Sequence, residues 1–134
     1  MTDKEEFLSR LNSRSPFNEY NGVTVTDVAE GFAEVTGKLV PETLNPWGTA
    51  HGAFVYALCD VAAGVAAANM ATRSCVTLSA GISYLRPSEG TYLRAEGRVL
   101  KTGHSVAFVQ TDVYDDKGRQ TARGEFQFYM TDGR

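Results

Sequence analysis

The sequence predicts an α+β protein in which a curved antiparallel sheet of about six strands wraps around one long central helix. Residues 50–71 are rich in alanine and apolar on nearly every side, which indicates a helix that must be buried. The other segments carry the short apolar patterns of β-strands, separated by turns of glycine, proline and aspartate. A sheet that curves around the helix would bury most of its surface.

The elements before the long helix are short. Apolar residues at helical spacing predict an amphipathic helix over residues 3–12, which Ser15-Pro16 ends. Residues 22–40 hold two β patterns on either side of a turn at Glu30-Gly31. Residues 41–49 contain two prolines, an asparagine and a glycine and are expected to form a loop.

Four further strands are expected after the long helix. The clearest spans residues 75–85, where apolar side chains alternate with threonine, serine and glycine, so that Thr77 lies on the small-residue face. The remaining strands are expected at residues 91–100, 104–114 and 119–130, joined by turns at 101–103 and 115–118. No repeat or linker divides the chain, and a single domain over residues 1–134 is expected.

The composition argues against several classes of protein. Apolar residues make up 43% and charged residues 22% of the 134 residues, a globular mixture that excludes wholesale disorder. The net charge of −3 leaves no basic surface typical of nucleic-acid binding. Two cysteines are too few for a disulfide framework, and the acidic start lacks the apolar run of a signal peptide. We therefore expect a soluble protein of a reducing compartment, the cytoplasm, with no nucleic-acid partner.

A membrane span is the alternative interpretation of the long apolar run, since roughly 20 apolar residues would suffice. Asp60 near its middle argues against this, because a carboxylate at mid-bilayer is costly. The helix face that the sheet leaves uncovered is rich in alanine and glycine, and a second subunit is expected to bury it. We expect a homo-oligomer with a dimer as its minimal unit and a tetramer as the fuller assembly, and no membrane partner.

Four special residues cluster around the start of the helix: Asn45, His51, Gly52 and Asp60. Gly52 either serves a tight turn or offers the unpaired N–H of a helix N-terminus to a developing oxyanion. Asp60 has no Lys or Arg within a helical turn, so it is either a carboxylate held by hydroxyl groups at a wet interface or a general base or nucleophile. His51 is either a helix cap or a positioning residue, and Asn45 is either a turn former or a functional side chain.

The spacing of Gly52 and Asp60 carries a geometric consequence. They lie eight residues apart on one predicted helix, which separates their backbones by roughly 12 Å. A single reacting carbonyl would need a hydrogen-bond donor and a base within about 3 Å each, and an aspartate side chain is too short for both to come from one chain. An antiparallel helix pair across a two-fold axis would bring Gly52 of one subunit near Asp60 of the other, with two composite sites per dimer.

The other chemistry-bearing residues have simpler interpretations. Cys59 and Cys75 are expected to be small core residues. His104 lies at a predicted hairpin and is expected on the surface, with ligand contact as the alternative. Two histidines far apart in sequence, without cysteine at metal-ligand spacing, predict no metal site. The sequence also lacks a phosphate-binding glycine loop and a serine nucleophile elbow.

Residues 45–53, Asn-Pro-Trp-Gly-Thr-Ala-His-Gly-Ala, followed by Leu58-Cys59-Asp60, resemble the N-x-x-G-x-x-H-G-G…D signature of the hotdog-fold acyl-CoA thioesterases. The run Ile82-Ser83-Tyr84-Leu85-Arg86-Pro87 and the hairpin around residues 116–118 are also similar to the phenylacetic-acid-degradation (PaaI-type) members of that family. The likeness covers residues 17–130 and implies the hotdog fold, a curved antiparallel sheet wrapped around a central helix.

The resemblance implies a role for each matched residue. The Gly52 N–H would polarise the thioester carbonyl, and Asp60 of the neighbouring subunit would activate water or attack as a nucleophile. Asn45 and His51 would position the carbonyl or the attacking water. Thr77 falls where some relatives carry a serine or threonine that orients the water, the alternative being a hydroxyl that simply faces the helix.

Coenzyme A is the other implication of the resemblance. Family members bind it along a subunit interface as part of the substrate, so no separate cofactor is expected, and the cations expected near its nucleotide are Arg86, Lys101 and His104. The chain departs from the signature at Ala53, where the family has a second glycine. The added methyl group would narrow the acyl pocket while leaving the Gly52 donor in place.

The sequence therefore predicts an acyl-CoA thioesterase that hydrolyses a thioester to a carboxylic acid and free coenzyme A. Trp47, Phe54 and Tyr56 either line a pocket for an aromatic acyl group, such as that of a phenylacetyl-CoA type, or pack the core. The alternatives are a non-catalytic acyl-CoA binding or sensing protein, a hotdog dehydratase or hydratase, and a structural dimer module. Dehydratase chemistry would need a catalytic histidine, for which only His51 is well placed, and a structural module leaves Asp60 unexplained.

Overall fold

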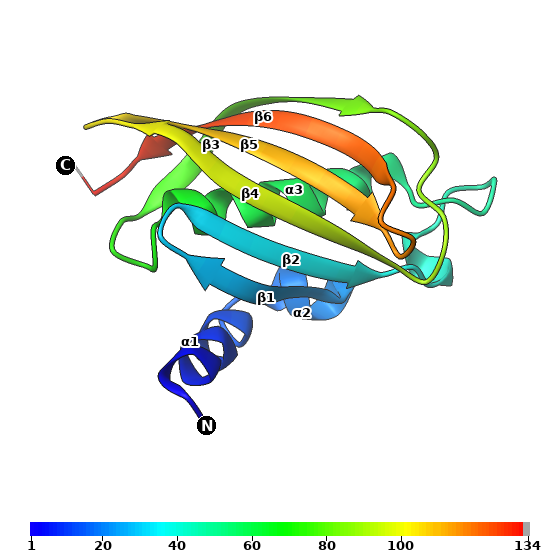
Figure 1. The fold of residues 1–134 in the computed structure, drawn as a ribbon, viewed down its shortest axis with the longest axis horizontal. Helices are drawn as coiled ribbons and strands as arrows, with labels where there is room; N and C mark the ends of the chain where they lie inside the picture. Colours follow the sequence, from blue (N-terminus) through cyan, green and yellow to red (C-terminus); the bar gives the residue numbers. More distant parts are fainter. Residues whose placement is uncertain (133–134) are drawn as a thin grey trace.

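The computed structural model describes residues 1–132, and residues 133–134 of the expected domain lie outside the described part. Six strands are present: β1 (Val23–Ala29), β2 (Phe32–Lys38), β3 (Cys75–Tyr84), β4 (Tyr92–Thr102), β5 (Val106–Asp115) and β6 (Gln120–Met130). They form one antiparallel sheet in the order β1-β2-β4-β5-β6-β3, which curves around a central helix (Figure 1). The predicted architecture, a curved six-stranded sheet around one helix, is confirmed.

The central helix α3 (Gly52–Ala67) is shorter than the predicted 50–71. It stops because Asn69, Met70 and Ala71 all adopt positive φ, at 48°, 59° and 62°. Such a left-handed turn is costly for residues with a Cβ, and a distant contact fixes its start: the Asn69 side chain accepts a hydrogen bond of 2.9 Å from the Gly31 N–H in the β1–β2 turn. Alanine propensity alone would have continued the helix.

The buried side of α3 packs directly on the sheet. Small residues permit this close approach: an added Cβ at Gly97 of β4 would lie 2.6 Å from the Ala62 carbonyl oxygen. A Cβ at Gly37 of β2 would lie equally close to the Phe54 ring, which places that ring in the core rather than in an open pocket. The buried residues of α3 are Phe54, Val55, Leu58, Cys59, Ala62, Ala63, Ala66 and Ala67.

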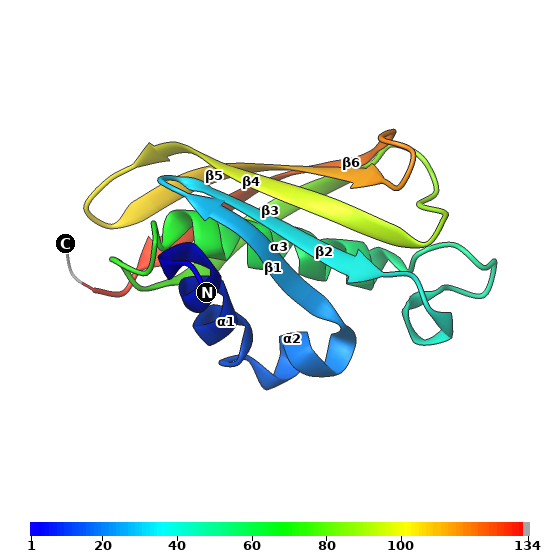
Figure 2. The same ribbon diagram turned by 60° about the horizontal axis from the view of Figure 1, so that its bottom comes forward.

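The N-terminal segment forms a helical hairpin. Helix α1 (Asp3–Asn12) matches its predicted range, but α2 (Pro16–Asn21) was not predicted. Ser15-Pro16 ends one helix and also begins the next, because the Ser15 hydroxyl accepts a hydrogen bond from the Asn18 N–H and proline suits the first helical position. The hairpin lies beside β1, on the side of the molecule where α3 is not covered by the sheet (Figure 2).

Smaller departures from the predicted boundaries have local causes. The loop over residues 41–49 contains one short 3-10 turn, η1 (Pro41–Thr43). Strand β4 continues to Thr102 rather than ending at residue 100, because a bulge between Val99 and Lys101 lets pairing resume with β5. Within residues 1–132, no helix has the length and apolar character required to cross a lipid bilayer.

Candidate active site

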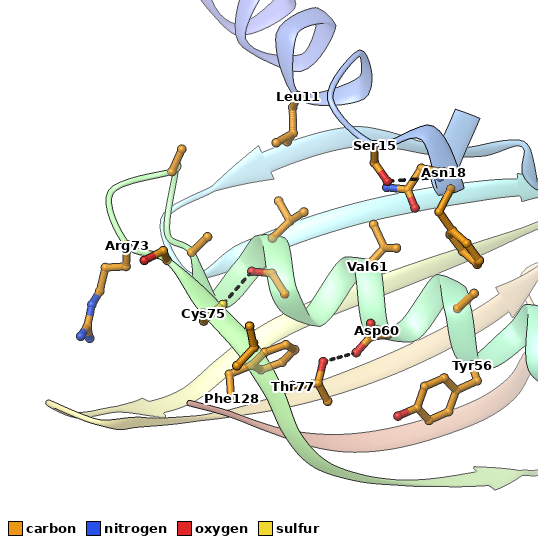
Figure 3. Close-up of a pocket in the computed structure, with 18 of the residues that line it drawn as sticks. Leu11, Ser15, Asn18, Tyr56, Asp60, Val61, Arg73, Cys75, Thr77 and Phe128 are labelled. Atoms are coloured by element: carbon orange, nitrogen blue, oxygen red, sulfur yellow. Dashed lines mark hydrogen bonds between the residues drawn. The ribbon is translucent and has the colours of Figure 1, made fainter. Parts of the chain in front are cut away.

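One face of α3 stays open between the N-terminal hairpin and β3. A groove of about 740 Å³ runs over this face, with the hairpin as one wall and β3 as the other (Figure 3). The residues that α3 and its C-cap Ala68 contribute to it recur at helical spacing: Ala53, Tyr56, Ala57, Asp60, Val61, Gly64, Val65 and Ala68. The small, apolar character expected for the uncovered helix face is present.

Asp60 and Thr77 meet in this groove. The Asp60 Oδ1 accepts a hydrogen bond of 2.7 Å from the Thr77 hydroxyl, and the two side chains point toward one another (Figure 3). Among residues 1–132 no Lys, Arg or His forms an ion pair with Asp60, which is half-buried rather than enclosed. A carboxylate that is unpaired, held by one hydroxyl and open to a groove has a free oxygen for a water molecule or a substrate.

Strand β3 presents Thr77 to the helix through a bulge between Thr77 and Ser79. The bulge interrupts the strict alternation that the sequence suggested, and Val76 and Leu78 are 56% and 59% exposed. Strand β3 is also an edge of the sheet, with β6 as its neighbour on one side and no strand of the described chain on the other. Sequence alternation cannot distinguish an edge strand with exposed apolar residues from an inner one.

Gly52 begins α3 and lies in a second opening. It is the first helical residue, and among residues 1–132 no group accepts a hydrogen bond from its N–H. Its carbonyl oxygen accepts a hydrogen bond of 2.7 Å from the Tyr84 hydroxyl of β3. A cleft of about 660 Å³ surrounds this helix start, lined by Asn45, Gly52, Tyr84 and Arg86 among others. The unpaired donor and the positive end of the helix dipole suit a developing negative charge.

Asn45 and His51 shape the approach to the helix. The Asn45 Oδ1 accepts hydrogen bonds from the N–H groups of Trp47 (3.0 Å) and Thr49 (3.1 Å), and its amide nitrogen donates to the Thr49 hydroxyl (2.8 Å). The His51 Nδ1 accepts a hydrogen bond of 3.0 Å from the Ala53 N–H, which makes His51 the helix cap. Within the chain both residues therefore do what their simpler interpretations require, forming a turn and a cap.

The three aromatic residues near the helix start lie in different environments. Trp47 is 84% exposed at the tip of the loop, and Phe54 belongs to the core. Of the three, Tyr56 lines the groove, with its ring centroid 5.4 Å from that of Phe126. Partial burial, together with the nearby Asp60 charge, raises the pKa of Tyr56 and keeps it a neutral hydrogen-bond donor.

The three cations expected near the coenzyme A nucleotide also lie in different parts of the chain. Arg86 lines the Gly52 cleft, whereas Lys101 and His104 lie exposed around the turn between β4 and β5, toward the other end of α3. One chain does not bring these three together. Arg73, which is not among the predicted site residues, lines the groove, but its guanidinium is bound to Asp132 and to the carbonyl oxygens of Gly103 and His104.

The cysteines and metal-binding groups add no further chemistry in residues 1–132. Both cysteines are free. Burial raises the pKa of Cys59 to about 12, so its thiol stays protonated, as expected for a core residue. Cys75 is half-buried, packs against the edge of the core and also lines the groove. The described residues contain no cluster of three or more His, Cys, Asp or Glu side chains that could hold a metal ion.

Tyr84 is the contact that sequence reasoning missed, although it lies within the run that resembles the PaaI-type enzymes. Its hydroxyl ties β3 to the first turn of α3 across 32 residues of chain. We expect Tyr84→Phe to lower the free energy of unfolding by about 0.5–1.5 kcal/mol, the usual net value of one hydrogen bond. Urea denaturation measures this, with Tyr92→Phe as the control because no described group bonds the Tyr92 hydroxyl. Equal losses in both variants would contradict the assignment.

The family model described as the thioesterase superfamily matches residues 48–122, which is more than half of the chain and contains Gly52, Asp60 and Thr77. The chain belongs to the thioesterase superfamily. This membership, together with the fold, confirms the resemblance to PaaI-type hotdog enzymes and identifies the chain as a thioester hydrolase.

Solved structures similar to this thioesterase include three informative relatives. Protein TT0310 of Thermus thermophilus is 31% identical, with a TM-score of 0.80, covering 87% of this chain and 97% of that one. A variant of the phenylacetic acid degradation protein PaaI from the same organism is 29% identical (TM-score 0.79; 86% and 98% covered). A hypothetical thioesterase from Streptococcus pneumoniae, solved with coenzyme A, is 26% identical (TM-score 0.76; 81% and 85%). A search of curated proteins finds no match to the chain.

Proposed function

We propose that this thioesterase hydrolyses an acyl-CoA in a site shared by two subunits, with the Gly52 N–H of one and the Asp60 of the other. One observation carries the proposal: the unpaired Gly52 donor and the Asp60–Thr77 pair line different openings of the same chain. About 12 Å of helix separates them, as the rise per residue requires. The groove therefore has a carboxylate but no oxyanion donor from Gly52, and the cleft has that donor but no Asp60. The coenzyme A bound to the pneumococcal relative supports an acyl-CoA as the substrate.

The exposed features of the chain favour a dimer. Strand β3 has an unpaired edge with exposed apolar side chains, and the α3 face beside it is also open. Unpaired apolar edges are normally covered, because they invite association. A second copy that pairs along β3 with its helix antiparallel would set Asp60 of the partner subunit near the Gly52 end of α3. Arg86 would then be the cation nearest the thioester, and Lys101 and His104 would reach the coenzyme A nucleotide only from the partner subunit.

The chemistry follows from these positions. The Gly52 N–H stabilises the negative charge that develops on the thioester oxygen. Asp60 either takes a proton from the attacking water or attacks the carbonyl itself to form an anhydride that water then cleaves. The Thr77 hydroxyl holds one carboxylate oxygen and leaves the other free. In both routes the carbon–sulfur bond breaks, water supplies the hydroxyl of the acid, and the coenzyme A thiolate leaves and takes up a proton.

Mixed dimers test the shared site. Gly52→Pro and Asp60→Asn subunits, each inactive in its own dimer, should form a heterodimer with one intact site out of two and about half the wild-type rate. Two affinity tags isolate the heterodimer, and a thiol-reactive dye follows the released coenzyme A. No recovery in verified heterodimers would reject the shared site.

A second heterodimer provides the matched control. A subunit carrying both substitutions, paired with a wild-type subunit, leaves every shared site with one damaged half. We therefore expect it to be inactive. A site contained within one chain would instead leave that dimer half active, so the two heterodimers give opposite results under the two arrangements.

We also propose that the acyl group is apolar, with an arylacetyl group as the first one to test. The similarity to the Thermus PaaI protein supports this choice, as does the apolar groove in which Asp60 lies. A panel of aromatic, short and long aliphatic acyl-CoAs would test it through the ranking of kcat/KM.

A further inference from the structure

The N-terminal hairpin turns an apolar side toward the groove that contains Asp60. Phe7 and Leu11 of α1 and Phe17 of α2 all line it, and Phe17 is 57% exposed. Neither helix contains a fully buried residue. Phe7 and Leu11 are half-buried and pack against the edge of the core, whereas Phe17 is exposed. They form an apolar surface that faces an open space.

Polar contacts with β1 help to hold the hairpin in place. The Asn12 side chain pairs with the backbone of Val25, donating to its carbonyl oxygen (2.9 Å) and accepting from its N–H (2.8 Å). Lys4 forms an ion pair of 2.5 Å with Asp27, also on β1. These polar groups and the packing of Leu8 against the core fix the hairpin to the rest of the chain. Phe17, which is exposed, is the part of its apolar side that is left for the groove.

The groove that the hairpin faces suits a neutral, apolar occupant. Among its lining residues the charged ones are Asp60 and Arg73, and the Arg73 guanidinium is already bound to Asp132 and to backbone carbonyls. Asp60 lies near the middle, and about 12 Å of the α3 face extends from it to Ala68. The wall opposite the hairpin, β3, carries Thr77, whose hydroxyl holds Asp60 of α3.

We propose that the α1–α2 hairpin is the selectivity wall of the acyl site, with Phe17 and Leu11 in contact with the distal part of an apolar acyl group. This inference rests on the proposed function, because it takes the thioester carbon to lie at Asp60. The partner subunit takes the β3 edge and the α3 face beside it, on the side of the groove away from the hairpin, so the substrate is the occupant of the hairpin side. A partner paired there leaves the hairpin wall to the acyl group.

Substitution of Phe17 tests the proposal. We expect Phe17→Ala to lower kcat/KM for phenylacetyl-CoA and hexanoyl-CoA about tenfold, because the lost contacts belong to the distal acyl atoms. Acetyl-CoA, which is too short to reach the wall, should keep its kcat/KM to within about twofold. Phe17→Leu should restore most of the loss. The control is Tyr20→Ala on the same helix, since Tyr20 is 91% exposed and does not line the groove.

Each other outcome overturns the proposal. Equal losses for acetyl-CoA and phenylacetyl-CoA, or the same losses in Tyr20→Ala, would show that Phe17 acts on the fold and not on the acyl group. A changed subunit mass for Phe17→Ala in light scattering would show that a second copy covers the wall. An unchanged kcat/KM of Phe17→Ala for phenylacetyl-CoA would show that Phe17 does not contact the acyl group. If the wild-type enzyme hydrolyses none of the three substrates, the proposed function itself fails, and this is visible before any variant is made.

Discussion

Asp60→Asn is expected to lower kcat for acyl-CoA hydrolysis by about 10²–10⁴ without changing the fold or the subunit mass. Asparagine has the same shape and keeps an oxygen that can accept the Thr77 hydrogen bond, so the contact between α3 and β3 survives. It can neither take a proton from water nor attack the carbonyl as a carboxylate. Initial rates of coenzyme A release measure the loss, while circular dichroism and light scattering check the fold and the assembly.

Two further variants show whether the loss in Asp60→Asn is specific to the Asp60 carboxylate. Asp3→Asn removes an exposed carboxylate at the start of α1 and should keep full activity. Thr77→Val removes the hydroxyl that holds Asp60 but leaves the carboxylate, so we expect a smaller loss, about tenfold, corresponding to one hydrogen bond. Near-normal hydrolysis by Asp60→Asn would remove Asp60 from the mechanism.

The fold was predictable where the local pattern carries the information. The alanine-rich run of α3 and the period-two strands each follow from neighbouring residues, and a helix that is apolar all round requires a sheet to surround it. The end of α3 was not predictable in this way. The turn after Ala67 depends on the bond between Asn69 and Gly31, which are 38 residues apart. Helix propensity depends only on a residue and its neighbours in sequence, so it cannot indicate a hydrogen bond between residues this far apart.

The candidate site likewise has features that the local sequence predicts and features that depend on contacts between distant segments. The separation of Gly52 from Asp60 follows from helix geometry. Gly52 was singled out by its place at the helix start and Asp60 as a carboxylate in a buried helix, and the resemblance supplied the role predicted for each. The sequence also placed Thr77 on the right strand, but the contact with Asp60 depends on a bulge that the pattern does not reveal. Tyr84 and the Phe17 wall were missed because each comes from a segment distant in sequence from α3.

Gly52→Pro is expected to lower kcat by about 10²–10³, the usual loss for one oxyanion donor, while the helix still forms. Proline is favoured at the first helical position, which is where Gly52 lies. His51 before it already has φ −63° and ψ 135°, a conformation that a following proline allows. Because no group of residues 1–132 accepts the Gly52 N–H, the substitution breaks no hydrogen bond of the folded chain.

Gly52→Ala separates loss of the donor from crowding. It keeps the N–H, and its Cβ would lie 3.4 Å from the Tyr84 ring and hydroxyl, an ordinary contact. We therefore expect near-wild-type kcat from alanine and a large loss from proline, with the loss in kcat rather than in KM, because the oxyanion forms only in the transition state. An active proline variant would show that another group stabilises the oxyanion. Equal losses in both would assign the effect to the added carbon and leave the donor without a role.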